Sequence, residues 1–239
     1  NDYLIKKWGS NYVVSITAST GVAAINIGSS TIHWFSSIRT GKHKINTIIN
    51  RIMKDNECVE RWKKVNTLII DEISMISKDI FEKLDIIGKN IRQSDKPFGG
   101  IQLILLGDFY QLTPIMDNET EFCFESEIWN SSIDKTITLT EIFRQTDNGY
   151  KDMLNRIRYA KHTFDDIINI KSRIIEYNDD DIIKLYPLNS QVNEENNKQL
   201  HKLSGNLVNY KAKYFGDRNL VSDLKSQFIV CGRDDIKLK

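Results

Sequence analysis

The chain has 239 residues, of which 40% are hydrophobic and 27% are charged, a balance that is typical of globular proteins and excludes a disordered one. A formal net charge of +1 excludes a strongly basic surface overall. Any contact with nucleic acid therefore has to be made by a local group of hydrogen-bond donors. The apolar runs are far shorter than a membrane span, and we expect no membrane partner.

Apolar runs and helical patterns alternate through the first part of the chain. Strands that alternate with helices form mainly parallel sheets flanked by helices, so the pattern predicts an α/β fold. In chain order, we expect the tail of a helix that ends at Gly9, a strand at 13–17, a short helix at 22–25, a helical segment at 42–64, a strand at 67–70, a helix at 78–93, and strands at 101–106 and 136–139.

The composition changes in the second part of the chain. Residues 150–184 are rich in Ile, Asp, Asn and Lys and indicate helices, a strand-like element begins at 185–187, and a helix follows at 193–203. We therefore expect two domains, at 1–138 and 139–239.

The three cysteines and four histidines are scattered along the sequence. They form neither a CxxC pair nor a spacing that is typical of zinc sites. An odd number of scattered cysteines favours a reducing compartment over a disulfide framework. We expect no metal cluster made only of protein ligands.

Two adjacent carboxylates, Asp71 and Glu72, follow the apolar strand in the segment LIIDEIS. In open α/β sheets, ligands bind at the carboxyl ends of the strands, and a buried carboxylate is costly unless it is paired or bound to a metal. One of the two acids can hold Mg²⁺, and its neighbour can take a proton from an attacking water. The alternative is a strand that simply meets a solvated loop.

The segment GDFYQLTPI at 107–115 follows the next apolar strand. Gly107 lets the chain turn. Gln111 offers both a donor and an acceptor without charge, which suits it to sensing a terminal phosphate or orienting water. The alternative is an ordinary loop with a surface glutamine.

The segment LTEIFRQ at 139–145 places Arg144 after the last predicted strand. The planar guanidinium suits phosphate, and an arginine that reaches across a domain cleft acts as an arginine finger, which contributes about 10³–10⁵ in rate in other phosphoryl-transfer enzymes. The alternative is a surface arginine in a salt bridge.

Short hydroxyl side chains follow the first strand, at Thr17, Ser19 and Thr20. Hydroxyls and backbone amides of this kind hold phosphodiesters. His33 and Phe35, with Trp34 between them, then supply a donor and flat faces for unpaired bases.

Core packing is the alternative for the two neighbouring rings, Trp34 and Phe35, and we expect it to hold for one of them. Later in the chain, Asn189 follows the strand-like element and suits contact with a nucleic-acid backbone. Asn193 suits the N-cap of a helix.

The order of these segments resembles the Pif-type (petite integration frequency) DNA helicases, of the RecD-like branch of helicase superfamily one. The resemblance covers most of residues 13–205. The segments that carry it are TASTGVAAINIGSSTIH, LIIDEISMI, GGIQLILLGDFYQLTPI, LTEIFRQ and LYPLNSQVNEENNKQL.

The resemblance implies a RecA-like P-loop ATPase core with a partial second RecA-like domain. It implies ATP as substrate, Mg²⁺ as cofactor, and movement along single-stranded DNA, 5′ to 3′, with separation of duplexes at junctions. Asp71 would hold Mg²⁺, Glu72 would activate water, Gln111 would sense the γ-phosphate and Arg144 would reach it from the second domain. Residues 17–35 and 189–193 would lie along the DNA strand, through Thr17, Ser19, Thr20, His33, Phe35, Asn189 and Asn193.

The chain departs from that family in one respect, because no GxxxxGKS or GxxxxGKT motif is present. We expect this P-loop to lie upstream of Asn1 and the chain to be an interior part of a longer helicase. Alone, it is expected to hydrolyse ATP very poorly or not at all. Two other hypotheses are a single-stranded DNA-binding module derived from a helicase that has lost catalysis, and a different P-loop enzyme such as a packaging or recombination ATPase. The FRQ and TASTG segments argue against the latter.

Overall fold

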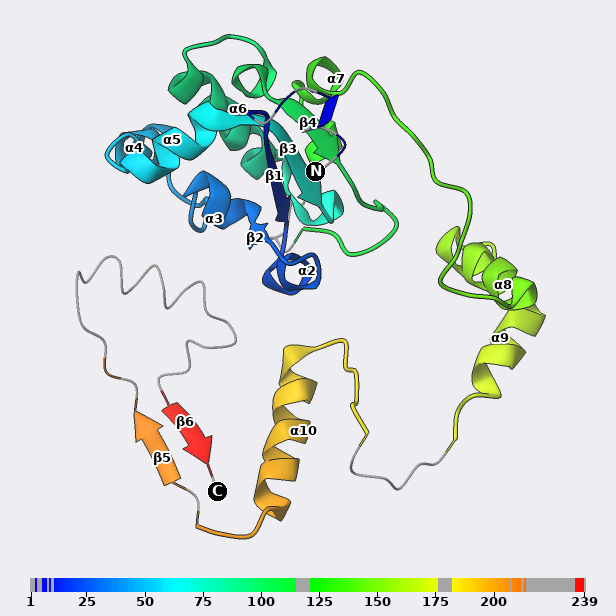
Figure 1. Cartoon of the computed structure of the whole chain (residues 1–239). Helices are drawn as coiled ribbons and strands as arrows, with labels where there is room; N and C mark the ends of the chain where they lie inside the picture. The colour runs from blue at the N-terminus through cyan, green and yellow to red at the C-terminus, as the bar shows by residue number, and fades with distance from the viewer. Residues whose placement is uncertain are drawn as a thin grey trace. The chain divides into compact units, whose positions relative to one another are not determined.

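The computed structural model describes residues 3, 6–7, 9, 11–114, 121–175, 182–206, 208–211, 213 and 235–238 (Figure 1). Most of the helix tail predicted before Gly9, and Ile115 of the GDFYQLTPI motif, lie outside the described residues. The chain divides into two compact units, 1–163 and 164–239, called unit 1 and unit 2. Among the described residues, no helix combines the length and apolar character that crossing a membrane requires.

Unit 1 contains a four-stranded, fully parallel sheet in the order β2-β1-β3-β4 (Figure 1). Its strands are β1 (Val13–Ala18), β2 (Ser30–Thr31), β3 (Val65–Asp71) and β4 (Gln102–Leu105). The strands predicted at 13–17, 67–70 and 101–106 are therefore confirmed. Because the strands are parallel, their carboxyl ends and the segments that follow them meet at one edge of the sheet.

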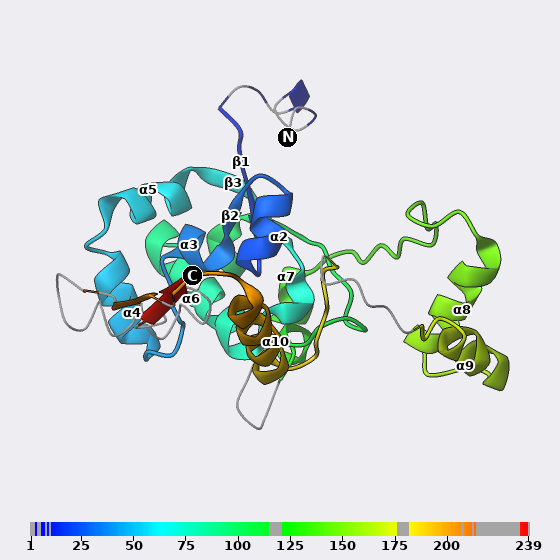
Figure 2. The ribbon, with the colours of Figure 1, turned by 90° about the horizontal axis from the view of Figure 1, so that it is seen from below.

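Helices and short 3-10 turns connect these strands, and two more, η3 and α7, follow β4. They are α2 (Gly21–Asn26), α3 (Ile32–Ser36), α4 (Ile45–Ile52), α5 (Asn56–Lys64), η1 (Ile73–Met75), α6 (Lys78–Arg92), η2 (Pro97–Gly100), η3 (Cys123–Glu125) and α7 (Trp129–Ser132). The segment predicted at 42–64 forms two helices, because the Asp55 side chain accepts a hydrogen bond from the Cys58 backbone and begins α5. α2 lies beyond the carboxyl end of β1, and Figure 2 views the chain from that side.

The core lies between β3, α5 and α6, where Trp62, Leu68 and Phe81 are fully buried. α6 follows a helical period of apolar residues and begins at Ser77, whose hydroxyl accepts a hydrogen bond from the Ile80 amide. At its other end, Arg92 donates to the carbonyls of Trp62, Lys63, Val65 and Gly99. These bonds join the end of α5, the start of β3 and the η2 turn to one guanidinium.

Two predicted strands are wrong. Residues 136–139 are irregular, with Ile137 and Leu139 mostly exposed, and residues 185–187 are irregular as well. Their β-branched and apolar composition favours a strand, but no strand in the described part of the chain pairs with either segment. The chain continues from residue 139 into α8 (Asn148–Arg158), which closes unit 1.

Unit 2 contains α9 (Phe164–Lys171), α10 (Asn189–Lys202) and an antiparallel pair, β5 (Val208–Lys211) and β6 (Asp235–Leu238) (Figure 1). The helix predicted at 193–203 therefore begins four residues earlier, at Asn189. The predicted domain boundary between residues 138 and 139 stays a prediction, since compact units defined by contacts do not test it.

Candidate functional site

The segments that follow β1, β3 and β4 are hydrogen-bonded to one another at the carboxyl edge of the sheet. The Ser19 amide donates to the Asp71 carbonyl at 3.0 Å. On the other side of β3, the Leu106 amide donates to the Ile70 carbonyl and the Ile73 amide donates to the Leu106 carbonyl, both at 2.9 Å. The acid pair, Asp71 and Glu72, therefore lies between two loops. One is the hydroxyl-rich loop after β1, which contains Ser19 and Thr20, and the other is the loop after β4 at residues 107–111, called the GDFYQ loop.

Asp71 and Glu72 are both half-buried. The Glu72 amide donates to Asp71 Oδ1 at 3.0 Å, which fixes the orientation of the Asp71 carboxylate. Glu72 itself has φ 54° and ψ 46°, a left-handed conformation that costs a residue with a β-carbon about 1–3 kcal/mol. Such conformations cluster at active sites, where the surrounding structure maintains them. The turn points to a functional use of the Glu72 side chain.

The chemistry of this edge fits Mg²⁺ with a nucleotide. Mg²⁺ in phosphoryl-transfer sites takes one or two protein carboxylates and fills its remaining positions with phosphate oxygens and water. Asp71 would supply such a carboxylate. The hydroxyls of Ser19 and Ser74, which flank the acid pair in the loop after β1 and the turn after β3, are buried and have no hydrogen-bond partner among the described residues. Buried hydroxyls without a partner indicate a place for water or a ligand.

The loop after β4 passes very close to the turn that follows Glu72. A β-carbon on Gly107 would lie 2.9 Å from both Ile73 Cγ2 and the Ile73 amide nitrogen, so only glycine permits this approach. Four residues later, Gln111 is exposed, and its side-chain amide donates to Asp108 Oδ2 at 3.1 Å. The structure therefore brings the GDFYQ loop to the acid pair, as the strand order requires.

Arg144 lies on the irregular segment that precedes α8 and is exposed. Within the described part of the chain it forms no hydrogen bond or ion pair, with the acid pair or with any other residue. The alternative of a surface salt bridge therefore has no support. The structure leaves the guanidinium accessible without bringing it to the acid pair.

The hydroxyl groups after β1 differ in accessibility. Thr17 is fully buried, and its hydroxyl donates to the Ile69 carbonyl at 2.8 Å, so the prediction that this side chain holds DNA is corrected to a bond between β1 and β3. Ser19 is 8% exposed. Thr20 is half-buried and caps α2 by accepting a hydrogen bond from the Ala23 amide at 3.2 Å.

The two neighbouring rings of α3 face opposite ways. Phe35 is buried against Trp62, with 5.3 Å between the ring centroids, and the prediction that Phe35 contacts DNA is corrected because its ring lies in the core. Trp34 is 60% exposed, and the Arg61 guanidinium lies 4.5 Å from its ring centroid. The expectation that one of the two rings packs in the core is confirmed. Burial lowers the pKa of His33 below its ordinary value, so this imidazole is neutral at pH 7.

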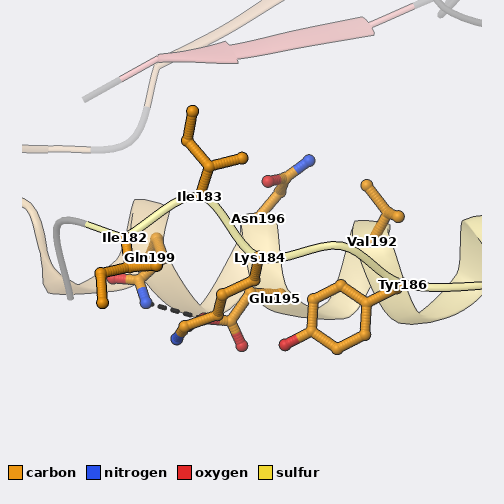
Figure 3. A pocket seen from close by; sticks show the side chains of 8 residues that line it. All are labelled: Ile182, Ile183, Lys184, Tyr186, Val192, Glu195, Asn196 and Gln199. Carbon is orange, nitrogen blue, oxygen red and sulfur yellow. Dashed lines mark hydrogen bonds and ion pairs between the residues drawn. The ribbon is translucent and has the colours of Figure 1, made fainter. Parts of the chain in front are cut away.

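The asparagines of unit 2 both lie on α10 and are exposed. Asn189 is the first residue of the helix, and Asn193 lies in its second turn, so the N-cap predicted at Asn193 is wrong. Beside this helix lies a hollow of about 270 Å³, bordered by Ile182, Ile183, Lys184 and Tyr186 (Figure 3). There the Lys184 ammonium, 2.6 Å from the Glu195 carboxylate, lowers the pKa of Glu195 to about 2.

Sequence reasoning missed the residues that hold the GDFYQ loop on its outer side. Asp108 forms a 2.7 Å ion pair with Arg158 at the end of α8, and the ring of Tyr110 lies 5.0 Å from that of Tyr159. Asp108 and Arg158 are fifty residues apart in the sequence. A lone acid and a lone arginine at such a separation carry no local signal of pairing.

Comparison with known proteins gives the same result at the level of sequence. The sequence model of the PIF1-like helicases matches residues 3–172. The ATP-dependent DNA helicase RRM3 of Saccharomyces cerevisiae is 44% identical over 206 residues, which cover 83% of this chain and 28% of RRM3. The chain thus spans less than a third of that relative's length.

Solved structures extend the comparison to the fold. The crystal structure of the Pif1 helicase from Candida albicans matches with a TM-score of 0.82 at 35% identity, over 100% of this chain and 55% of that one. The Pif1 helicase from Bacteroides in complex with ADP-AlF3 and ssDNA matches with a TM-score of 0.72 at 28% identity, over 99% and 56%. The predicted RecA-like α/β fold with a mainly parallel sheet is confirmed.

Proposed function

This chain belongs to the PIF1-like helicase family, and from that premise we propose that it works as part of an ATP-dependent DNA helicase. In this proposal, ATP hydrolysis drives movement along single-stranded DNA, 5′ to 3′, and separates duplexes at junctions. One observation carries the proposal beyond the family name. Asp71, Glu72 and the GDFYQ loop lie together at one edge of the sheet. Beside them are the buried hydroxyls that have no hydrogen-bond partner among the described residues.

The roles follow from the positions of the side chains. Asp71 holds Mg²⁺, which neutralises charge on the phosphates when it is bound. Glu72 accepts the proton of the attacking water, since it directly follows Asp71 at the carboxyl edge of the sheet. Gln111 contacts the terminal phosphate from the loop after β4, and the accessible guanidinium of Arg144 stabilises the charge that develops there.

The DNA strand is assigned to the loop after β1 and to α3, the helix that follows β2. The hydroxyls of Ser19 and Thr20 are assigned to phosphates, and neutral His33 offers a hydrogen bond without charge. The exposed face of Trp34 replaces the buried Phe35 as the stacking ring. Asn189 and Asn193 are assigned to the same strand from α10.

The test uses the full-length gene product that contains these residues. Glu72→Gln keeps the size and hydrogen-bonding capacity of the side chain and removes the base. We expect DNA-stimulated ATP turnover to fall on the order of 10²–10⁴-fold, with nucleotide binding retained. Glu127→Gln, on an exposed glutamate of unit 1, serves as the matched control and leaves turnover unchanged. Normal turnover by Glu72→Gln removes Glu72 as the base.

The exposed ring of Trp34 favours a second candidate, a single-stranded DNA-binding module without catalysis. The same protein distinguishes the two. A module binds single-stranded DNA with an affinity that falls as salt rises, shows no effect of ATP on that binding, and hydrolyses no ATP.

A further inference from the structure

The GDFYQ loop is held on its outer side by a carboxylate with both oxygens engaged. Asp108 Oδ1 accepts hydrogen bonds from Arg158 Nη2 at 2.7 Å and from the Tyr110 amide at 3.0 Å. Asp108 Oδ2 accepts from the side-chain amide of Gln111 at 3.1 Å. One carboxylate therefore joins the end of α8 to the side chain predicted to meet the terminal phosphate.

Aromatic contacts reinforce this ion pair. The Arg158 guanidinium lies 5.1 Å from the ring centroid of Tyr110 and 5.5 Å from that of Tyr159, at distances where a cation is attracted to a ring. The Asp108 side chain is only 17% exposed and that of Arg158 is 39% exposed, so the pair is better shielded from water than a typical surface salt bridge.

The residue between Asp108 and Tyr110 anchors the loop in another direction. The Phe109 ring packs against Phe122, Phe124 and Trp129, at centroid distances of 6.1, 4.8 and 6.1 Å. Three successive side chains therefore fix the loop from two sides. The body of unit 1 holds Phe109, and α8 holds Asp108 and Tyr110.

The other end of α8 lies next to the segment that carries Arg144. Residues 140–143 and the α8 residues Lys151, Asp152 and Asn155 line one groove of about 430 Å³. The helix thus contacts the FRQ segment near its beginning and the GDFYQ loop at its end. A displacement of α8 would therefore shift both the FRQ segment and the GDFYQ loop.

We propose that Asp108 and Arg158 form a clamp that positions Gln111 for the terminal phosphate, an inference that rests on the proposed function. Arg158 is a positioning residue and acts in two ways. It binds Asp108 Oδ1 and so fixes the carboxylate whose Oδ2 accepts from Gln111, and it compensates a carboxylate that would otherwise repel the phosphate.

The first experiment needs no nucleotide. Amide hydrogen exchange is measured by NMR on the 239-residue chain and on its Arg158→Ala and Arg158→Lys variants. We expect exchange at Tyr110 and Gln111 to rise about fivefold to tenfold in Arg158→Ala, and less in Arg158→Lys, which keeps the charge but loses the planar fork. Exchange in β1 and β3 stays the same. Lys161→Ala, on an exposed lysine three residues along, is the matched control.

The second experiment measures ATP turnover of the full-length gene product with single-stranded DNA. Arg158→Ala is expected to lower kcat about tenfold with little change in KM for ATP, and Arg158→Lys to restore part of the loss. Combined with Gln111→Ala, the Arg158→Ala substitution causes almost no further loss, because both substitutions remove one interaction. A general loosening of the structure would instead multiply the two losses.

Three results bear on the clamp. Unchanged exchange at Tyr110 and Gln111 in Arg158→Ala overturns it, and multiplicative losses in the double variant overturn its action through Gln111. An unsubstituted protein without turnover contradicts the proposed function, while the exchange experiment still decides whether Arg158 holds the loop.

Discussion

Glu72 adopts a left-handed backbone conformation that glycine would occupy without steric cost, yet it carries the carboxylate of the predicted base. Its neighbours maintain this turn, because the Glu72 amide is bound to Asp71 Oδ1 and the next amide, that of Ile73, is bound to the Leu106 carbonyl. These two hydrogen bonds to the edge of the sheet thus offset the cost of the left-handed backbone conformation at Glu72.

Two replacements of Glu72 that both remove the carboxylate measure the cost of the backbone conformation by itself. We expect Glu72→Gly to be more stable than Glu72→Ala by about 1 kcal/mol, because only glycine relieves the contact of the β-carbon in the left-handed region. Urea unfolding of the two variants measures the difference. Equal stability of the two would show that the turn relaxes when the carboxylate is removed.

His33 gives unit 1 a dependence on pH. Burial lowers its pKa in the folded protein, whereas the unfolded chain titrates at about 6.5, so below that pH the unfolded state binds more protons. The contribution of His33 to stability is therefore complete above about pH 6.5 and is lost progressively as the pH falls from that value toward the lower pKa of the folded state.

The prediction is that His33→Asn loses less stability than the parent chain between pH 7.5 and pH 5.5. Urea midpoints at the two pH values test this. The matched control, His162→Asn, replaces an exposed histidine and is expected to keep the pH dependence of the parent. An identical loss in His33→Asn and the parent would contradict the assignment.

The contact between α6 and η2 decides where β4 begins. Asp85 on α6 is buried, accepts a hydrogen bond from the Phe98 amide at 2.7 Å, and pairs with Lys89 at 2.7 Å. Gly88 allows the helix to touch the turn, since a β-carbon there would lie 2.8 Å from the backbone carbon and oxygen of Phe98. Because β4 directly follows η2, this packing fixes where β4 starts and therefore where the GDFYQ loop lies.

Gly88→Ala is expected to destabilise the chain by about 1–3 kcal/mol, the usual cost of overpacking against a backbone that cannot move. Gly21→Ala is the matched control, because Gly21 also lies in a helix but has open space where the β-carbon would be added. It should leave stability unchanged or raise it by up to about 1 kcal/mol. Urea midpoints that fall equally in both variants would contradict the packing argument.

The whole chain concentrates its core in unit 1. All the apolar side chains that the structure shows buried lie between Ala18 and Cys123, and none of them belongs to the described part of unit 2. Apolar burial is the main source of folding free energy, so unit 1 carries most of the stability.

A chain shortened to residues 1–163 should therefore unfold cooperatively at the same urea midpoint as the 239-residue chain. All four tryptophans precede residue 164, so tryptophan fluorescence reports on unit 1 in both proteins. A clearly lower midpoint for the shortened chain would show that unit 2 stabilises unit 1.

Sequence patterns predicted best where the structure depends on neighbouring residues. The apolar runs before Asp71 and Gly107 identified β3, which is largely buried, and β4, which is partly buried, because an apolar run of strand length is marked by its own composition. The same reasoning was wrong at residues 136–139. Their composition suits a strand, but a strand also needs a partner, and composition says nothing of partners.

In the candidate site, too, some features follow from local sequence and others only from tertiary packing. The sequence by itself determined the α/β fold, the acid pair at a strand end and the family, because these depend on short apolar runs and on motifs in a particular order. Only the tertiary structure decided that Phe35 is buried while Trp34 is exposed, and that Asp108 meets Arg158. The physical reason is that local preference acts over a few residues, whereas burial and ion pairing depend on which distant segments the packing brings together.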